Sequence, residues 1–299
     1  MSHSMTRREP APSRLDGGWH KHGRYLGRFL TQHWWTYLVV ALLVVVIGGP
    51  FYWMLISSLK TQSELLAQPP TLFPQAPVLS AYRALIDTGF MRYLQNSILV
   101  SLVTVLLSTF LGICAGYSLS RFDFPGSKLV GRLLLFAYAF PGVLLMVPMY
   151  ILASRLHLLD NLLALPIVYV TFTAPFCSWL MRSFFATIPA EVEESALIDG
   201  ATRWQAIWKV VVPLSAPGVA TAALWTFFMS WSEYMFAVIL ISSDENMTLP
   251  VGLARWVSFQ FKDWSVMNAG AVVSIVPVLI LFAFLGRSFV AGLTAGSVK

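Results

Sequence analysis

Charged residues are scarce in this sequence of 299 residues. Asp, Glu, Lys and Arg together make up 11% of it, while hydrophobic residues make up 57%. Soluble globular domains carry about 25% charged residues, so the shortage excludes an ordinary soluble protein. The composition predicts an integral membrane protein surrounded by a lipid bilayer.

Cysteines and catalytic motifs are lacking too. The two cysteines, Cys114 and Cys177, lie in hydrophobic stretches, where a thiol behaves as a small apolar group. Two such cysteines supply neither a disulfide framework nor a metal site. The sequence contains no G-x-x-x-x-G-K-[ST], H-E-x-x-H or G-x-S-x-G pattern. We therefore expect no enzyme active site and no cofactor in this chain.

The sequence does contain long apolar runs without Lys, Arg, Asp or Glu. Each run exceeds the roughly 20 residues that an α-helix needs to cross about 30 Å of hydrocarbon. Because lipid offers no hydrogen bonds to bare backbone, these runs should be helical. The predicted fold class is an all-α membrane protein with six transmembrane helices, over residues 29–59, 93–120, 133–154, 161–181, 210–232 and 264–286.

Prolines and glycines should shape the packing of these helices. Prolines inside three of the runs are expected to kink their helices or to free carbonyl groups inside the bundle. They are Pro141 and Pro148 in the third run, Pro166 and Pro175 in the fourth and Pro277 in the sixth. Gly112 and Gly116 in the second run have the small-xxx-small spacing that lets two helices approach closely. We expect that approach to occur within the bundle.

The positions of the basic residues predict the orientation in the membrane. With the amino terminus in the cytoplasm, 14 of the 20 Lys and Arg lie on the cytoplasmic side and six lie outside. Cytoplasmic loops carry such an excess, so both termini are predicted to be cytoplasmic. Residues 1–28 are predicted to be a flexible basic cytoplasmic tail, and residues 29–299 the membrane domain. Topology then explains the net charge of +6, and nucleic acid need not be invoked.

The longest polar interruption in the second half of the chain is EESALIDGATRWQAIWKVVVP, which starts at Glu193. Pro189 suits the first turn of a helix, because its missing N–H costs nothing there. Glu191, Glu193 and Glu194 suit the positive amino-terminal end of that helix, with about 0.3–1 kcal/mol each when exposed. A first helix is predicted over about 189–198.

That helix should end at Asp199 and Gly200, because glycine fits the left-handed position after a helix and Asp-Gly favours a turn. The Asp199 carboxylate is expected to face the amides that open the next helix. Thr202 and Gln205 have the spacing of a capping box, so a second helix should begin at Arg203 and run towards Pro213. The segment predicts a cytoplasmic helix-turn-helix between the fourth and fifth spans. From composition alone, an ordinary pair of interfacial helices remains an alternative.

The same segment contains a more specific pattern, in which Glu-x-Ala is followed at fixed spacings by Gly, two aliphatic residues and Pro. Its residues are Glu194, Ser195, Ala196, Gly200, Val210, Val212 and Pro213. The pattern closely resembles the Glu-Ala-Ala loop of the permease subunits of ABC importers. Ser195 stands where that loop usually has its first alanine, and Val210 and Val212 stand for the usual Ile and Leu. These changes keep the small or aliphatic character.

Other stretches are similar to the carbohydrate-uptake branch of that family, specifically to its smaller, maltose-type second permease. They are SSLKTQSELLAQPPTLFPQAPVLSAYRAL, NSILVSLVTVLLSTFLGICAGYSLSRFDFPG, WSEYMFAVIL and the ending GLTAGSVK. The resemblance covers residues 35–299.

The resemblance implies a coupling mechanism in the bacterial cytoplasmic (inner) membrane. The chain would pair with a homologous second permease, and an extracytoplasmic solute-binding protein would deliver a carbohydrate or related solute. Each permease would present its loop, here about 186–213, to ATP-binding subunits that use ATP and Mg. The residues implied in docking are Glu194, Ser195, Ala196, Asp199, Gly200, Val210, Val212 and Pro213. The small residues would let the loop enter a cleft, and the Glu194 carboxylate could meet a basic partner group.

Glu233, which directly follows the fifth apolar run, is the one carboxylate expected to lie inside a membrane span. A charge near the middle of a membrane costs several kcal/mol unless it is paired, hydrated or protonated, so Glu233 should face the bundle interior. It is a candidate for the translocation pathway, together with the flanking Trp231 and Tyr234, since aromatic rings stack on sugars. A structural hydrogen bond or a place near the outer interface is the alternative.

Two other functional classes also fit a bundle of six helices. A secondary transporter or channel without an ATPase partner would need coupling-ion groups or a selectivity ring, and only Glu233 is available. In such a protein the polar segment at residues 193–213 would have no evident function. An intramembrane enzyme would need clustered nucleophiles, metal ligands or acidic motifs, and the sequence contains none.

Overall fold

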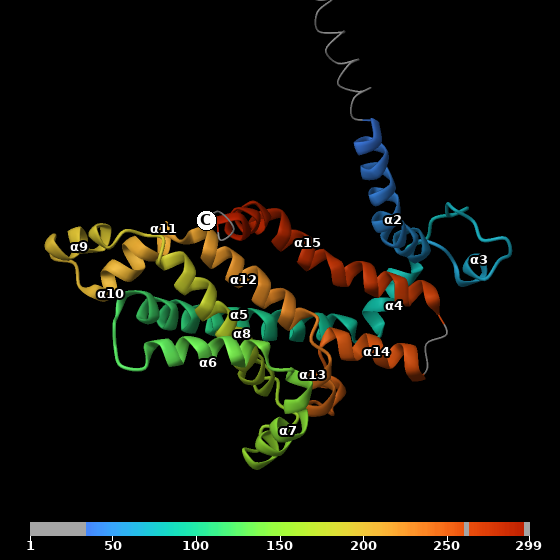
Figure 1. Cartoon of the computed structure of the whole chain (residues 1–299). Coiled ribbons are helices and arrows are strands. Elements are labelled where there is room, and N and C mark those ends of the chain that lie inside the picture. Colours follow the sequence, from blue (N-terminus) through green and yellow to red (C-terminus); the bar gives the residue numbers. More distant parts are fainter. Residues whose placement is uncertain (1–33, 260–262, 296–299) are drawn as a thin grey trace, which may run out of the picture. The chain divides into compact units, whose positions relative to one another are not determined.

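The computed structural model describes residues 34–259 and 263–295. The predicted basic tail, residues 1–28, lies outside the described residues. Within them, every regular element is a helix (Figure 1). These elements are α2 (Trp34–Ser58), α3 (Gln62–Leu65), α4 (Ser80–Asp87), α5 (Phe90–Arg121), α6 (Ser127–Ala139), η1 (Gly142–Leu145), α7 (Met146–Arg155), α8 (Ala164–Phe185), α9 (Ala190–Ile198), α10 (Arg203–Ala206), η2 (Ile207–Val211), α11 (Val212–Leu214), α12 (Ala216–Trp231), α13 (Met235–Leu240), η3 (Asp244–Asn246), α14 (Leu249–Phe259) and α15 (Trp264–Ala295).

Four of these helices, α2, α5, α8 and α15, are long and apolar enough to cross a membrane. The other two predicted spans are bent helix pairs rather than single helices. The helices α6 and η1–α7 meet at 92°, and α10–α11 meets α12 at 82°. The described residues therefore contain four candidate spans, or up to six if each bent pair crosses the membrane once.

Prolines account for both bends. Phe140 is extended, with φ −71° and ψ 130°, as the ring of the following Pro141 favours. Pro213 and Pro217 flank Ser215, where α11 ends and α12 begins, and neither proline has an N–H to continue a helix. The prolines inside α8 and α15 do not end those helices.

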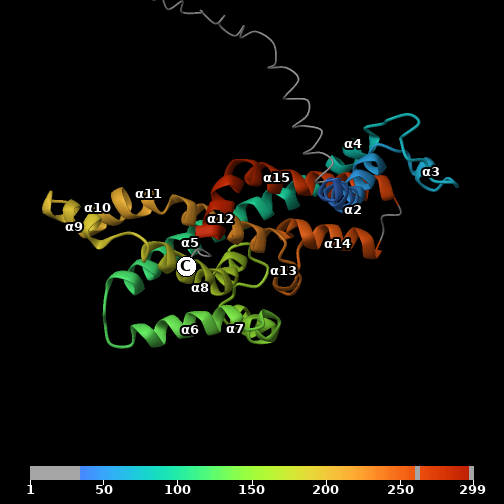
Figure 2. The same ribbon diagram turned by 45° about the horizontal axis from the view of Figure 1, so that its top comes forward.

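The chain divides within α2, between Trp53 and Met54. In the first unit, the described residues form one apolar helical segment with mostly exposed side chains. From Met54 onwards, the helices pack around α5, which contacts both α8 and α12. Helix α12 also packs against α15, and α6 lies beside α8 (Figure 2).

The contact between α5 and α8 is close because α5 carries glycines on that face. A Cβ added at Gly112 would lie 2.5 Å from the Cβ of Cys177, and one added at Gly116 would lie 2.7 Å from the backbone nitrogen of Arg182. The predicted small-residue pair therefore packs inside the bundle. Polar side chains cross the interfaces beside it, since the Ser108 and Thr173 hydroxyls lie 2.6 Å apart.

Replacing Gly116 by valine should destabilise the bundle, because the side chain would have to displace backbone of α8. Overpacking of this kind costs about 1–3 kcal/mol. The measurement is thermal unfolding in detergent. Gly48→Val is the matched control, since a Cβ there has nothing within 4 Å. Equal unfolding temperatures for the two variants would contradict the packing described.

Candidate functional site

The polar segment forms two helices, α9 and α10, joined by a turn (Figure 1). Gly200 lies in that turn with φ +88°, the left-handed conformation that favours glycine. Thr202 and Gln205 form the predicted capping box. The Thr202 hydroxyl accepts from the Gln205 amide at 3.3 Å, and the Gln205 side chain accepts from the Thr202 amide at 2.9 Å.

Three details differ from the sequence-based expectation. Pro189 occupies the N-cap position of α9, so the helix itself starts one residue later, at Ala190. Within the described residues, the Asp199 carboxylate makes no hydrogen bond to α10, because the Thr202 hydroxyl already caps that helix. The second helix begins at Arg203 as predicted, but it widens into the π-helical turn η2 before it ends at Leu214.

Most of the motif residues lie on the surface of this segment. Glu194, Ser195, Asp199, Gly200 and Pro213 are exposed, and Ala196, Val210 and Val212 are half-buried. Two large apolar side chains outside the motif are exposed at the ends of the turn: Ile198 is 86% exposed and Trp204 is 55% exposed. The sequence pattern did not single them out, because exposure depends on the fold.

Glu193 is not the exposed residue that the helix-dipole argument predicts, since only 5% of it is accessible. Its carboxylate accepts a hydrogen bond from Nε of Arg121 at 3.0 Å and another from the Tyr117 hydroxyl. Arg121 also donates from Nη2 to the Ile188 carbonyl at 2.9 Å. A second basic residue reaches the same end of α5, where the Arg203 guanidinium lies 5.0 Å from the centre of the Phe122 ring.

The helix-dipole argument failed for Glu193 because it uses only position along the helix. Glu191, Glu193 and Glu194 are equivalent by that criterion, but only Glu193 faces α5. The available signal was Arg121, a cation at the end of a predicted apolar span, which needs a partner if it is buried. The consequence is that α9 is attached to the end of α5 by a buried ion pair.

Glu233 lies between α12 and α13 and is half-buried. Its carboxylate accepts from the backbone amides of Phe236 at 2.8 Å and Ala237 at 3.1 Å, and from the Tyr169 hydroxyl at 2.6 Å. It also lines a cavity of about 220 Å³ between η1, α8, α12 and α13, together with Tyr169, Phe172 and Ser230. The structure thus supports both interpretations of Glu233. Its hydrogen bonds hold α13 in position, as a structural role requires, and its side chain faces a cavity, as a pathway role requires.

The two aromatic residues beside Glu233 do not line that cavity. Trp231 is buried among other side chains and stacks on Phe227 with ring centres 5.3 Å apart. Tyr234 is exposed and precedes the first residue of α13.

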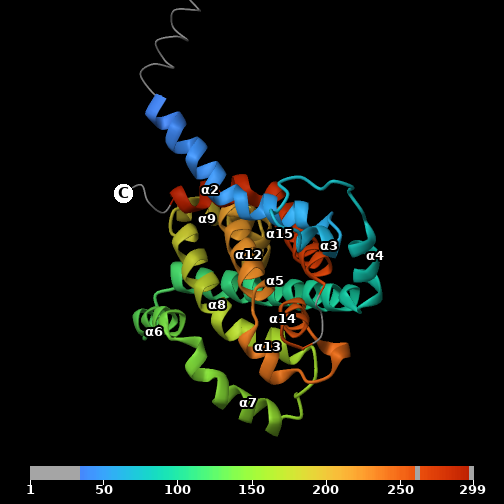
Figure 3. The ribbon, with the colours of Figure 1, turned by 90° about the vertical axis from the view of Figure 1, so that its right-hand side faces the viewer.

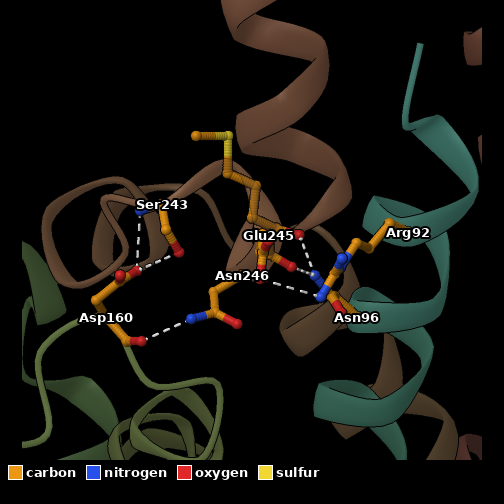
Figure 4. Close-up of polar contacts among 7 residues, drawn as sticks. Arg92, Asn96, Asp160, Ser243, Glu245 and Asn246 are labelled. Carbon is orange, nitrogen blue, oxygen red and sulfur yellow. Dashed lines mark hydrogen bonds and ion pairs between the residues drawn. The ribbon is translucent and has the colours of Figure 1, made fainter.

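A second polar cluster lies in the loops before α8 and after α13 (Figure 4). The Asp160 carboxylate accepts hydrogen bonds from the amides of Ser242 and Ser243, at 3.1 and 2.9 Å, and from the Ser243 hydroxyl. The Asn246 side chain donates to the Asp160 carbonyl at 2.7 Å. The amide of Ser243 above all holds the pKa of Asp160 below its ordinary value, although partial burial opposes this. Asp160 therefore joins the two loops as a carboxylate at neutral pH.

Possible metal ligands are few and scattered in the part of the chain that the structure describes. There, no group of three or more His, Cys, Asp or Glu could hold a metal ion. Cys177 is buried with its sulfur 3.2 Å from the Thr226 hydroxyl, and Cys114 is half-buried. The structure thus contains an exposed capped turn, an ion pair at its base and a largely apolar cavity beside Glu233.

Comparison with known proteins gives consistent matches over most of the chain. Residues 108–294 match the family profile described as "Binding-protein-dependent transport system inner membrane component". The inner membrane ABC transporter permease protein YcjP of Escherichia coli K12 is 38% identical over 266 residues, which cover 88% of this chain and 95% of the relative. The sulfoquinovosyl glycerol transport system permease protein SmoH of Agrobacterium fabrum is 38% identical over 263 residues, covering 87% and 92%.

A similar fold occurs in a crystal structure of a bacterial ABC transporter involved in the import of the acidic polysaccharide alginate. The TM-score is 0.76 at 24% sequence identity, and the match covers 94% of this chain and 100% of the other. At this identity the match concerns the fold of the helices.

Proposed function

Since this chain belongs to the family of binding-protein-dependent transport system inner membrane components, we propose that it is a permease subunit of an ATP-driven ABC importer for a carbohydrate or related solute. The observation that carries the proposal is the capped turn between α9 and α10, with its motif residues exposed. The solute class is supported by the relative from A. fabrum, which is named for sulfoquinovosyl glycerol.

The exposed turn has the features of a docking element. Ala196 and Ser195 add little bulk to α9, and Ile198 offers an apolar side chain that is 86% exposed. Glu194 is exposed and free to make a charge-assisted hydrogen bond with a basic group on a partner. In this proposal an ATP-binding subunit, which uses ATP and Mg, receives the turn in a cleft.

The remaining partners follow from the same proposal. A homologous second permease completes the pathway through the bilayer, and an extracytoplasmic solute-binding protein delivers the solute. A secondary transporter or channel is the less supported function, because it assigns no partner to the exposed turn and the family match argues for a binding-protein-dependent importer.

The arrangement of the loops supports the proposed orientation. The carboxyl-terminal end of α5 meets α9 at one end of the bundle, through Arg121 and Glu193. The α7–α8 and α13–α14 connections meet through Asp160 and Ser243. We assign the α9 end to the cytoplasm of the bacterial inner membrane, with both termini there, because 14 of the 20 Lys and Arg then lie inside.

The cavity at Glu233 is the proposed contribution of this chain to the translocation pathway. Its volume of about 220 Å³ is below the ~300–1,000 Å³ of typical small-ligand pockets, so a second permease would have to complete the site. Phe172 supplies an apolar wall, and Ser230 and the Glu233 carboxylate supply polar groups suited to hydroxyls. Trp231 and Tyr234 lie outside this lining and would act only indirectly.

Changes in the turn should uncouple the chain from its ATPase. A β-branched residue in the left-handed conformation is strained by about 1–3 kcal/mol, so Gly200→Val should displace α10 relative to α9. Ala196→Asp should add an unpaired charge to the docking surface. Both variants should insert in the membrane but lose ATPase co-purification and transport. Glu191→Gln, an exposed change on the same helix, is the control. Variants that bind ATPase and transport like the parent would exclude a docking role.

Cysteine labelling should give opposite results at the two ends of the bundle. With Cys114 and Cys177 replaced by alanine, a membrane-impermeant maleimide should label Ser242→Cys from outside and Asp123→Cys only from inside. Both positions are exposed. The reverse pattern would overturn the orientation and the proposed docking together.

Glu233→Gln should change the apparent affinity of sugar transport while the complex still assembles. Glutamine keeps one oxygen as an acceptor, but it places an NH2 donor where the other carboxylate oxygen accepted one or two of the three hydrogen bonds. A hydrogen bond to a charged group contributes about 1.5–3 kcal/mol, which corresponds to a change on the order of tenfold or more. Transport kinetics in proteoliposomes test this, with the exposed Glu245→Gln as control. Parent-like kinetics would leave Glu233 a purely structural role.

A further inference from the structure

Helix α5 is attached at one end to the segment that contains the docking turn. The Arg121–Glu193 ion pair joins them at 3.0 Å, and both side chains are largely buried, with 13% and 7% exposure. Tyr117, one turn earlier in α5, donates to the same carboxylate. Breaking a buried pair by removing one partner is strongly destabilising, because it leaves an uncompensated charge. Movement of α9 away from α5 is therefore resisted at this point.

At its other end, α5 is attached to the segment between α13 and α14 (Figure 4). The Asn96 side chain donates to the carbonyls of Glu245 at 2.9 Å and Met247 at 2.8 Å. The Leu249 amide donates to the Ser97 hydroxyl at 2.8 Å. These contacts are buried or partly buried, unlike the exposed Arg92–Glu245 ion pair beside them. Residues 245–249 are thus held to the first turns of α5.

Both attachments belong to α5, which is a single helix of 32 residues without proline. At 1.5 Å per residue it is about 48 Å long. The other routes from the docking turn are less direct. Helix α8 contains Pro175, and α12 is separated from α11 by an 82° bend. Figure 3 shows α5 crossing the bundle from the α6 side to the α4 side.

We infer that α5 transmits movement of the α9–α10 turn to residues 242–249 at the opposite end, with Arg121 and Glu193 as positioning residues at one attachment and Asn96 at the other. The inference rests on the proposed function, since it takes the α9–α10 turn as the site where an ATPase acts. Neither attachment lines the cavity at Glu233. Each connects α5 to its segment, and residues 242–246 are held in addition by Asp160 of the α7–α8 connection.

The experiment is hydrogen–deuterium exchange on the complex that co-purifies with this chain, with and without ATP plus orthovanadate. Exchange is measured in two peptides. Residues 190–198 show the response at the docking turn, and residues 242–249 show the response at the far end of α5. In the parent, both should change their exchange, the far one by on the order of fivefold or more, the lower range of typical coupling between sites.

Two variants break the two attachments. Arg121→Met combined with Glu193→Met removes both charges and leaves no unpaired ion, so the bundle should still fold. Asn96→Ala combined with Ser97→Ala removes the three hydrogen bonds of the far attachment and is independent of the first change. In each variant the nucleotide-dependent change at residues 190–198 should persist, while the change at residues 242–249 should be lost. Arg92→Gln is the matched control, because exposed ion pairs contribute little, and it should behave like the parent.

The outcomes separate the inference from the proposed function. If residues 190–198 do not respond to nucleotide in the parent, the docking proposal fails. If they respond but residues 242–249 do not, or respond equally in the parent and in both variants, α5 does not transmit the movement. Loss of the far response in both variants, with the near response retained, supports the inference.

Discussion

A carboxylate can be buried in so apolar a bundle only where hydrogen-bond donors satisfy its oxygens. An uncompensated buried charge costs several kcal/mol, which is a large share of the stability of a folded domain. Glu193 meets this requirement with Arg121 and Tyr117 of α5, and Glu233 meets it with Tyr169 of α8 and two amides of α13. Each carboxylate therefore attaches an otherwise peripheral segment to the central helices.

The contrast between continuous and bent helices gives this bundle both rigid and adjustable parts. Helix α5 is continuous, and its glycines bring it against the backbone of α8. The prolines at the α6–η1 and α11–α12 junctions remove backbone hydrogen bonds and allow sharp turns. Transporters alternate between discrete packings rather than deforming continuously. A rigid pair of helices beside two bent pairs is suited to such a transition.

The sequence predicted what depends on local chemistry and missed what depends on tertiary contacts. The capping box of Thr202 and the left-handed Gly200 were predicted because their determinants lie within a few residues. Six apolar runs were recognised, but run length alone does not distinguish a straight helix from a bent pair. Glu193 was assigned to the surface because its partners, Arg121 and Tyr117, lie more than 70 residues away. The cavity at Glu233 could not be predicted because it forms between four elements.

The central claim is that this chain works as one permease of a heteromeric importer, coupled through α9 and α10. Native mass spectrometry of the tagged chain, extracted from its own membrane in mild detergent, tests this most directly. The account predicts one particle that contains this chain, a second permease related to it and two ATP-binding subunits. A particle that contains only this chain, as a monomer or as a homo-oligomer, would contradict the account.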